Sequence, residues 1–406
     1  MTDSIRQLVN MLPIIGMLCI AIGLSLSHSL ISIGVGTLLI GFIGHPSVRL
    51  ALRNSSLSWR SLYLPFLFLY ILHGLSWFYT TDKAQWVTEM RIKLPMLFLL
   101  PATVATWMSA SEGEKKLIHL AFHLGLLIVG IGTLWRFFTN ISWGLEEMRQ
   151  GRYIPMVGGI SHIYYAGLVG VGIFFLWTLP GFAALKWRLL LTGLHMLILH
   201  TLALRTGLAA GYGTILLMLI FWTFRKPARW IWTSLVVMAF GLGLVSMVKC
   251  FPPMKRRWYH VLDDLATYKP GGEITYSSIA RRLAALEASW KAFWHSPFWG
   301  VGIADNQAAV FAEIPKLPYR WDKKAYILPH NQFVEYTLGF GIIGLSVFLV
   351  FWIKAAREPL GLFWVGWLIY WFLLMQVEAF LERQIGITSF LWGTGILWAQ
   401  LTQSKS

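Results

Sequence analysis

The chain has 406 residues, of which 56% are hydrophobic and only 13% are Asp, Glu, Lys or Arg. A soluble globular protein would carry roughly a quarter charged residues, so the composition excludes that class and predicts an all-α polytopic membrane protein. The net charge of +16 does not indicate a nucleic-acid partner, because most lysines and arginines lie in short loops between apolar stretches. Cys19 and Cys250 give neither a metal-ligand spacing nor a disulfide framework.

About twelve apolar stretches are long enough to cross roughly 30 Å of hydrocarbon as helices. They fall near 11–27, 28–44, 62–80, 92–108, 117–138, 160–180, 187–204, 206–224, 230–250, 328–353, 360–377 and 384–401. The first stretch lacks a small-residue cleavage site and is followed by another, so we expect an uncleaved first span. The sequence therefore predicts one membrane domain, residues 1–406, of about twelve transmembrane helices, with a long loop, 251–327, between helices 9 and 10.

Positive residues gather in alternate loops, which predicts the topology. One set of loops is opposed by only three glutamates and contains Arg49, Arg53, Arg60, Lys115, Lys116, Lys186, Arg188, Arg225, Lys226, Arg229, Lys354 and Arg357. Because cytoplasmic loops carry an excess of Lys and Arg, this set and both termini are expected in the cytoplasm. The other set faces outward and comprises 82–93, 140–159, Arg205, the long loop and 378–383.

The long loop contains a segment with helical periodicity. Apolar residues spaced by three or four predict an amphipathic helix over 278–296; they are Ile279, Leu283, Leu286, Trp290 and Phe293. On a helical wheel, Arg282 falls within this apolar stripe, whereas Arg281 points nearly the opposite way, towards water. A buried arginine needs an anionic partner. Arg282 is therefore either a snorkelling or ion-paired side chain or a group that offers paired donors to a phosphate.

Two segments that follow this helix can contribute to a site. The glycines and proline of 297–302 predict a turn, which is either a plain turn or one that brings the backbone close to a ligand. His330 is expected to open the tenth span, where the helix dipole favours the neutral imidazole. A neutral imidazole accepts a proton near pH 7. The alternative is an interfacial histidine that only caps or packs.

Other charged residues lie near the outward ends of spans. Arg205 lies between two apolar stretches and is either functional or an anchor, because a charge so close to the membrane must be paired or reach water. Glu378 and Glu382, four residues apart, form a cluster with Arg383 and can simply neutralise nearby arginines. His162 is either functional or a packed interfacial histidine. The sequence contains no Asp-x-Asp pattern, Glu/His cluster, Walker motif or dinucleotide fingerprint, so no metal site or cofactor is expected.

Three segments together resemble the O-antigen ligase and polymerase superfamily of bacterial envelope glycosyltransferases. The first runs from Arg282 through residues 290–292 to the Pro-x-x-Gly-x-Gly pattern at 297–302. The second is the Leu-Pro-His-Asn-Gln-Phe segment at 328–333, which is followed by 339–344. The third is Arg-Thr-Gly at 205–207. Segments 380–384 and 161–165 resemble variants of Bacteroidetes-type members. The sequence departs from the family pattern because a second arginine, Arg281, directly precedes the matched one. The spacing to Pro297 favours Arg282 as the arginine that corresponds to the family's.

This resemblance implies a metal-independent, inverting glycosyltransferase of the GT-C type without a cofactor. Its donor would be a glycan on undecaprenyl diphosphate, and its acceptor a sugar hydroxyl of lipid A-core. Arg205 and Arg282 would bind the diphosphate and His330 would activate or orient the acceptor hydroxyl. Further candidates for substrate binding are Arg281, Asn331, His162, Glu378, Glu382 and Arg383. We expect a monomer in the bacterial inner membrane with its site facing the periplasm.

Three alternative functions remain open from the sequence. An O-antigen polymerase or a protein O-glycosyl ligase would use the same donor with another acceptor; the His-Asn pair after the long loop favours a ligase. A secondary transporter belongs to a different class. Transporters with two similar halves carry a long link after the sixth span, whereas here that link, near 179–187, is short.

Overall fold

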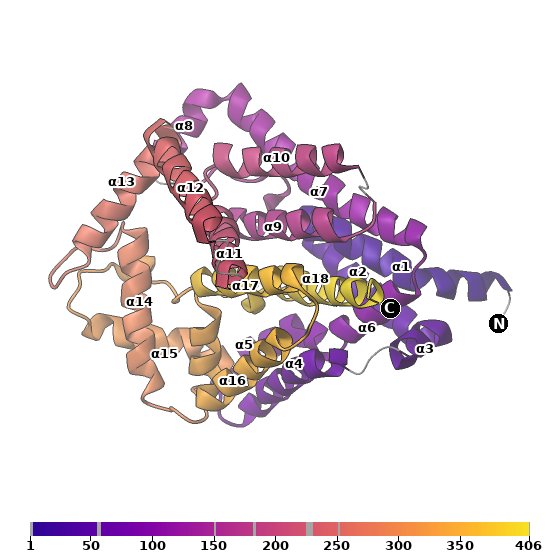
Figure 1. The fold of residues 1–406 in the computed structure, drawn as a ribbon. Helices are drawn as coiled ribbons and strands as arrows, with labels where there is room; N and C mark the ends of the chain where they lie inside the picture. Colours follow the sequence, from indigo (N-terminus) through magenta and orange to yellow (C-terminus); the bar gives the residue numbers. More distant parts are fainter. Residues whose placement is uncertain are drawn as a thin grey trace.

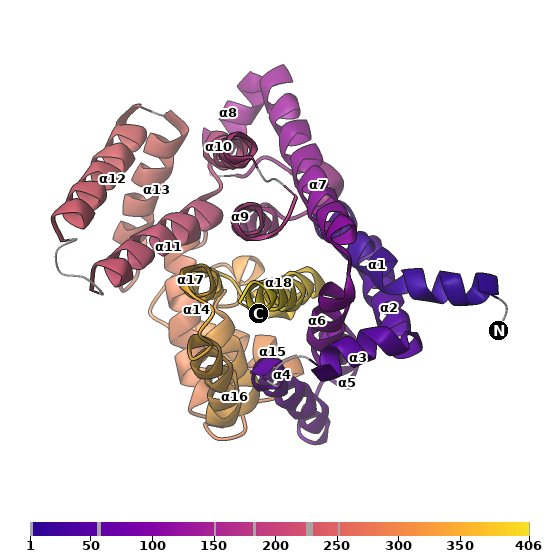
Figure 2. The same ribbon diagram turned by 45° about the vertical axis from the view of Figure 1, so that its right-hand side comes forward.

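The computed structural model describes residues 3–54, 58–149, 152–181, 184–224, 230–250 and 252–405. Over these ranges the chain is helical (Figures 1 and 2), and the only sheet-like pairing is a single bridge between Glu273 and Arg320. Arg225, Lys226 and Arg229, which support the predicted topology, and Phe251, the first residue of the long loop, lie outside the described residues.

A helix overlaps each of the twelve apolar stretches. These helices are α1 (Asp3–Leu26), α2 (His28–Gly44), α4 (Ser58–Leu75), α6 (Leu99–Ser109), α7 (Glu112–Thr139), α9 (His162–Thr178), α10 (Leu185–Thr201), α11 (Arg205–Phe224), α12 (Trp230–Cys250), α16 (Gln332–Ala356), α17 (Leu362–Val377) and α18 (Gln384–Gln403). Within the described residues, five segments are long and apolar enough to cross a membrane, or six if α2 and the bent α3 (Pro46–Asn54) form one span. The chain is a helical membrane protein, and the count of twelve spans stays a prediction.

Helix α18 lies at the centre of the molecule. Figure 2 shows it surrounded by α6, α9 and α17. Every residue from Ile385 to Ala399 is buried, including Trp392 and Trp398. A helix that is mostly apolar on all sides lies in a protein core or spans a membrane, and α18 is buried among the other helices. Its first turn is consequently held rigidly, which matters because the segment just before it contributes to the site described below.

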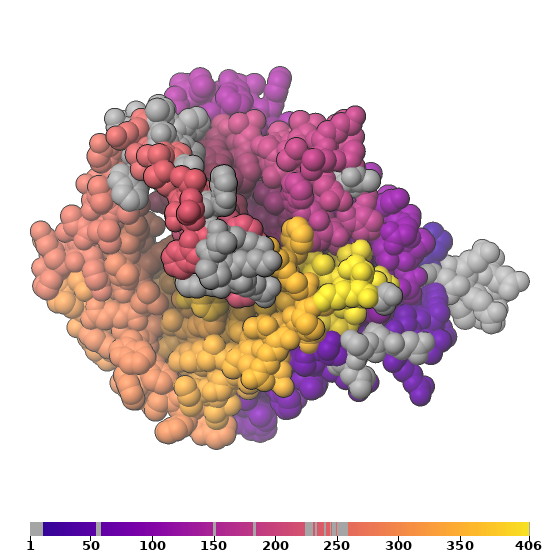
Figure 3. Space-filling view, viewed as in Figure 1, coloured from indigo at the N-terminus to yellow at the C-terminus, as the bar shows by residue number. Residues whose placement is uncertain are grey.

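The segment between α12 and α16 forms three short helices at one end of the bundle. They are α13 (Pro252–Thr267), α14 (Ser278–Phe293) and α15 (Asn306–Glu313). In Figure 1, α14 lies across the direction of α9 and α18, and in Figure 3 the orange surface of α14 and α15 covers this end. Ile274, Val310, Ile314 and Leu317 pack with the alanines of α14 in a small core of their own. This end of the bundle is therefore a built layer and not an extended loop.

The face that α14 buries differs from the one the sequence predicted. The helix begins after the cap Ser277 and ends at Phe293, three residues before the expected end, and its buried residues are Ala280, Ala284, Ala285, Ala288, Ser289 and Ala292. Trp290, from the predicted apolar stripe, is 60% exposed. The prediction was wrong because small side chains allow α15 and α16 to approach closely, which leaves the large side chains outside.

As a result, the two arginines of α14 lie in environments that differ from the predicted ones. Arg281 follows the spacing of the buried alanines and is half-buried; its guanidinium donates to the carbonyls of Ser277 (3.2 Å) and Ala325 (3.3 Å). The expectation that Arg281 faces water was therefore wrong. Arg282 is also partly buried, but it lies at the flank of the alanine face and not within an enclosed apolar stripe.

The turn at 297–302 approaches a helix backbone. The amides of Val301 and Gly302 donate to Leu338 (2.8 Å) and Gly339 (3.1 Å) of α16, and the amide of Ile342 donates to Pro297 (2.9 Å). Helix α16 kinks at this contact, where Gly341 has φ 63°. A Cβ atom on Gly341 would collide with the carbonyl of Phe298. The glycines therefore allow the turn to pair with the kinked helix, and this pairing fixes the residues that follow the turn.

Candidate functional site

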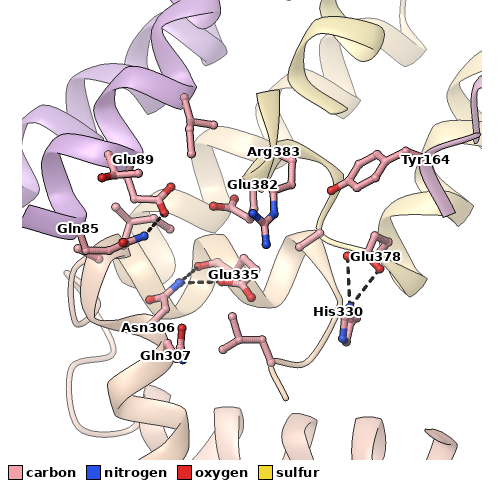
Figure 4. Close-up of a pocket in the computed structure, with 16 residues that line it drawn as sticks. Gln85, Glu89, Tyr164, Asn306, Gln307, His330, Glu335, Glu378, Glu382 and Arg383 are labelled. Carbon is pink, nitrogen blue, oxygen red and sulfur yellow. Dashed lines mark hydrogen bonds and ion pairs between the residues drawn. The ribbon is translucent and has the colours of Figure 1, made fainter. Parts of the chain in front are cut away.

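Two adjoining cavities lie where α5 (Lys83–Lys93), the turn at 303–307, the start of α16 and the link between α17 and α18 meet; Figure 4 shows the first of them. Their volumes are about 390 Å³ and about 580 Å³. Five residues line both cavities: Ile92, Tyr164, His330, Glu378 and Arg383. Segments far apart in the sequence thus bring a histidine, a carboxylate and a guanidinium to one shared wall.

His330 and Glu378 form a pair on this wall. Nδ1 of His330 lies 3.1 Å from Oε2 and 3.2 Å from Oε1 of Glu378. The Glu378 side chain is only 12% exposed, and that of His330 is 30% exposed. A carboxylate that accepts the Nδ1 proton leaves Nε2 free to accept another proton, and it stabilises the imidazolium that forms. The pair therefore has the composition of a general base with its orienting group.

His330 lies outside the helix it was expected to open. Helix α16 begins at Gln332 with Asn331 as its cap, so the helix-dipole argument for a first-turn histidine does not apply. His330 has φ 51°; among the described non-glycine residues only it and Ala203 have a positive φ. Such a conformation is costly and persists where the surroundings enforce it, often at functional sites.

Asn331 holds His330 in this position. Its Oδ1 accepts from the amides of Phe333 (2.9 Å) and Val334 (3.2 Å), and its Nδ2 donates to the backbone carbonyl (3.2 Å) and side-chain carbonyl (3.1 Å) of Gln376 near the end of α17. Asn331 thus ties the start of α16 to the end of α17, which brings His330 and Glu378 together. It does not line either cavity.

Glu382 is held by a buried lysine. It accepts from Lys93 Nζ at 2.7 Å and from Gln332 Nε2 at 2.9 Å, and the Lys93 side chain is completely buried. Lys93 also pairs with Glu89 at 3.0 Å. The sequence suggested that Glu378 and Glu382 neutralise arginines; within the described chain their partners are His330, Lys93 and Gln332. This network holds α5 against the link between α17 and α18.

The cationic candidates are distributed around the cavities. Arg383 is exposed and points into the first cavity in Figure 4. Arg282 Nη1 donates to the carbonyl of Val377 (3.2 Å), next to Glu378 in the sequence, and Arg282 does not line either cavity. Arg383, which the sequence offered only as a secondary candidate, is thus the arginine that lines both cavities together with His330 and Glu378.

Arg205 and His162 lie together beside the second cavity. Arg205 Nη2 donates to the hydroxyl of Tyr153 at 2.6 Å, and the guanidinium lies 5.7 Å from the centre of the Tyr153 ring. Tyr153 in turn stacks on His162, with ring centres 3.6 Å apart. Ser161 and Ile163 line the second cavity, whereas Arg205 and His162 do not. The Arg205 guanidinium thus lies against the Tyr153 ring, which stacks on His162 next to residues that line the second cavity.

Sequence reasoning missed two buried residues on the wall of the first cavity. Asn306 Nδ2 donates to Oε2 of Glu335 at 2.9 Å, and both residues are only 3% exposed. Glu335 lies one turn into an apolar span, where an ionisable residue is itself a signal of function. Asn306 gave no such signal, because nothing in its sequence context places it beside α16.

Asp305 fixes this part of the wall. Its carboxylate accepts from the amides of Thr81 (2.6 Å) and Asp82 (3.1 Å) and from the Thr81 hydroxyl (2.9 Å). Burial raises the pKa of Asp305, but these hydrogen bonds, with one from Thr80, outweigh burial and hold the pKa below its usual range. The charged carboxylate therefore ties the start of α15 to the start of α5.

The fold and the cavities define a helical membrane protein with a charged, histidine-containing site at one end of its bundle. Residues 189–349 match the family model described as O-antigen ligase, which supports the similarity of this chain to the O-antigen ligase superfamily. This family points to a membrane enzyme of the O-antigen ligase or polymerase type. The matched residues include Arg205, Arg282 and His330 but end before Glu378. A comparison with curated proteins returned no match.

Proposed function

We propose that this protein is an O-antigen ligase, which moves a glycan from undecaprenyl diphosphate to a sugar hydroxyl of lipid A-core. The observation that supports this reaction best is the His330–Glu378 pair on a cavity wall that also carries Arg383. A base beside an arginine suits a reaction in which a hydroxyl loses its proton while a diphosphate leaves. The GT-C class, the inverting course and the independence of metal belong to this proposal.

In the proposed mechanism, Nε2 of His330 removes the proton of the acceptor hydroxyl. The acceptor oxygen attacks the anomeric carbon from the face opposite the diphosphate, the bond from that carbon to the diphosphate oxygen breaks, and the configuration inverts. The imidazolium that forms is stabilised by Glu378 at 3.1 Å. The diphosphate leaves with the bonding electron pair, so negative charge grows on its oxygen atoms. Arginines next to these oxygens can stabilise that charge.

We propose that arginines stabilise this negative charge on the diphosphate. Arg383 lies on the wall, and Arg282 and Arg205, which do not line the cavities, are the further arginines that we propose to contact the diphosphate. Each guanidinium has five N–H donors in total, so Arg282 and Arg205 keep donors for phosphate oxygens beyond those that contact Val377 and Tyr153. Arg281 donates to two carbonyls and is half-buried, which makes it the weaker candidate of the adjacent pair.

The proposal places the protein as a monomer in the bacterial inner membrane, with the cavities open to the periplasm and both termini in the cytoplasm. We expect a membrane-impermeant maleimide to label Lys324→Cys, but not Lys116→Cys, in spheroplasts of a chain that carries Cys19→Ala and Cys250→Ala. Both positions are exposed, one beside α14 and one at the start of α7. Labelling of only Lys116→Cys would invert the orientation and remove the periplasmic reaction.

A strain that lacks the protein should make lipid A-core without long chains and accumulate lipid-linked polymer. This follows because a ligase acts after the polymer is complete. Gel electrophoresis of lipopolysaccharide, with extraction of the carrier lipid, measures both species. Core that carries a single repeat unit would instead identify a polymerase, and normal lipopolysaccharide with an underglycosylated protein would identify a protein ligase.

A further inference from the structure

The first cavity is chemically divided. Among the described residues that line it, Arg383 is the only Lys or Arg, whereas carboxylates and carboxamides form the opposite wall. We call this part the carboxamide wall; it consists of Gln85, Glu89, Asn306, Gln307 and Glu335. Figure 4 shows Gln85 and Glu89 reaching it from α5, and the other three from α15 and α16. Glu382, on the same cavity, adds a further carboxylate beside it.

Asn306 provides an acceptor that the fold does not use. Its Nδ2 donates to the carboxylate and to the backbone carbonyl of Glu335, which leaves Oδ1 as its remaining polar atom. Oδ1 is buried and has no hydrogen-bond partner within the described residues, although the side chain lines the cavity. A buried polar atom without a partner costs free energy unless a ligand or water satisfies it. The hydroxyl of a ligand in the cavity can donate to this atom.

The charge of the carboxamide wall restricts what it can bind. Glu89 and Glu382 share a single lysine, Lys93, at 3.0 Å and 2.7 Å, so their two charges are only half neutralised. Anionic groups are repelled by carboxylates at short range, most strongly where water is excluded. The leaving diphosphate is therefore directed to the side of the cavity that carries Arg383. Sugar hydroxyls, which both donate and accept, match carboxylates and carboxamides.

We propose that the carboxamide wall binds the hydroxyls of a neutral sugar ring next to the reaction centre and rejects sugars that carry a carboxylate there. This inference rests on the proposed glycan transfer and names the class of sugar that the site takes. The neutral sugar can belong to the acceptor or to the donor glycan. The wall is built mostly from side chains held by Asp305, Lys93 and the kinked α16, so it is rigid before the sugar binds.

The test uses full-length protein in proteoliposomes with four probes. Two are undecaprenyl-diphosphate glycans whose reacting sugar is a neutral hexose or the corresponding hexuronic acid; two are lipid A-core acceptors that differ in the same way. The wild-type protein should prefer the neutral form in one pair by about tenfold or more in kcat/KM. The reason is that the carboxylate of an acidic sugar is repelled by the carboxylates of the wall at close range, which weakens its binding. The pair that shows the preference identifies donor or acceptor as the occupant.

Glu89→Gln should reduce that preference by about tenfold, because the amide keeps the shape and removes the charge. Gln307→Ala, at an exposed position, should raise KM for the neutral probe by about three- to tenfold with little change in kcat, since it removes uniform binding. Glu273→Gln is the matched control: the same substitution at an exposed glutamate outside both cavities should leave the preference unchanged.

The ratio of kcat/KM for the neutral and the acidic probe separates specificity from folding, because a poorly folded variant transfers both probes more slowly and leaves the ratio unchanged. If the wild-type protein transfers neutral and acidic probes equally well in both pairs, the inference is overturned while the ligase proposal stands. If Glu89→Gln and Gln307→Ala both behave like the control, the carboxamide wall has no role in recognition. Absence of transfer with every probe would count against the proposed function itself.

Discussion

Replacing His330 by alanine should lower glycan transfer by about 100- to 10,000-fold, the usual contribution of a positioned general base. The substitution removes Nε2 from the cavity wall and leaves Glu378 without the imidazole that it holds at 3.1 Å. His330 is not part of a helix and is 30% exposed, so we expect the amount of membrane-inserted protein to stay normal. Transfer is measured with purified donor and lipid A-core in proteoliposomes, next to an immunoblot of the membrane fraction.

Two further variants separate catalysis from packing. Glu378→Gln keeps the hydrogen bond but removes the charge that stabilises the imidazolium, and we expect a loss of about 10- to 100-fold. His295 and Glu313 form another His–Glu pair, at 3.0 Å, away from both cavities, so His295→Ala should retain transfer. Full activity of His330→Ala, or an equal loss in His295→Ala, would exclude His330 as the base.

Replacing Lys93 by methionine should destabilise the protein by about 3–5 kcal/mol, the range for breaking a buried ion pair by removing one partner. Lys93 is fully buried between Glu89 at 3.0 Å and Glu382 at 2.7 Å, whose side chains are 13% and 19% exposed. Its loss leaves two poorly hydrated carboxylates that repel each other across the contact between α5 and the α17–α18 link. Thermal unfolding in detergent, followed by the loss of monodisperse protein, measures the effect.

Lys115 offers a matched comparison. It also pairs with a glutamate, Glu112, at 3.0 Å, but that glutamate is 64% exposed. The Lys115 side chain is itself only 7% exposed, but the Glu112 carboxylate that Lys115→Met leaves behind stays in water, so this substitution should cost less than about 1 kcal/mol. Adding Glu89→Gln and Glu382→Gln to Lys93→Met should restore part of the lost stability. Equal melting temperatures for the two lysine variants would contradict the role assigned to Lys93.

The two predictions concern different properties of one region. Lys93 and Glu382 hold α5 beside the cavity, and Asn331 holds His330 beside Glu378; the first contact supports the wall and the second positions the reacting group. A catalytic geometry must be held within a fraction of an ångström by its supporting side chains. Loss of the Lys93 network should therefore reduce activity through misplacement of the wall, even at temperatures where the protein stays folded.

The sequence by itself determined where the long apolar helices are, but not the shorter α3, α5, α13 and α15. Long apolar stretches must satisfy their backbone groups internally in lipid, so each becomes a helix, and a helix overlaps all twelve predicted stretches. Local residues also set helix ends, as the Ser277 side chain does where it caps the start of α14. The motif around His330 also identified the histidine that lies on the cavity wall. These features depend on residues close together in the chain.

Tertiary structure alone decided which side chains meet. His330 pairs with Glu378, 48 residues away, Asn306 with Glu335, 29 residues away, and Lys93 with Glu382, 289 residues away. The same packing made the alanines of α14 its buried face, moved Arg282 off the cavity wall and put Arg383 on it. Periodicity shows that a helix has faces but not which neighbour each face will contact. That choice depends on how closely the helices can approach, and so on side chains from several helices at once.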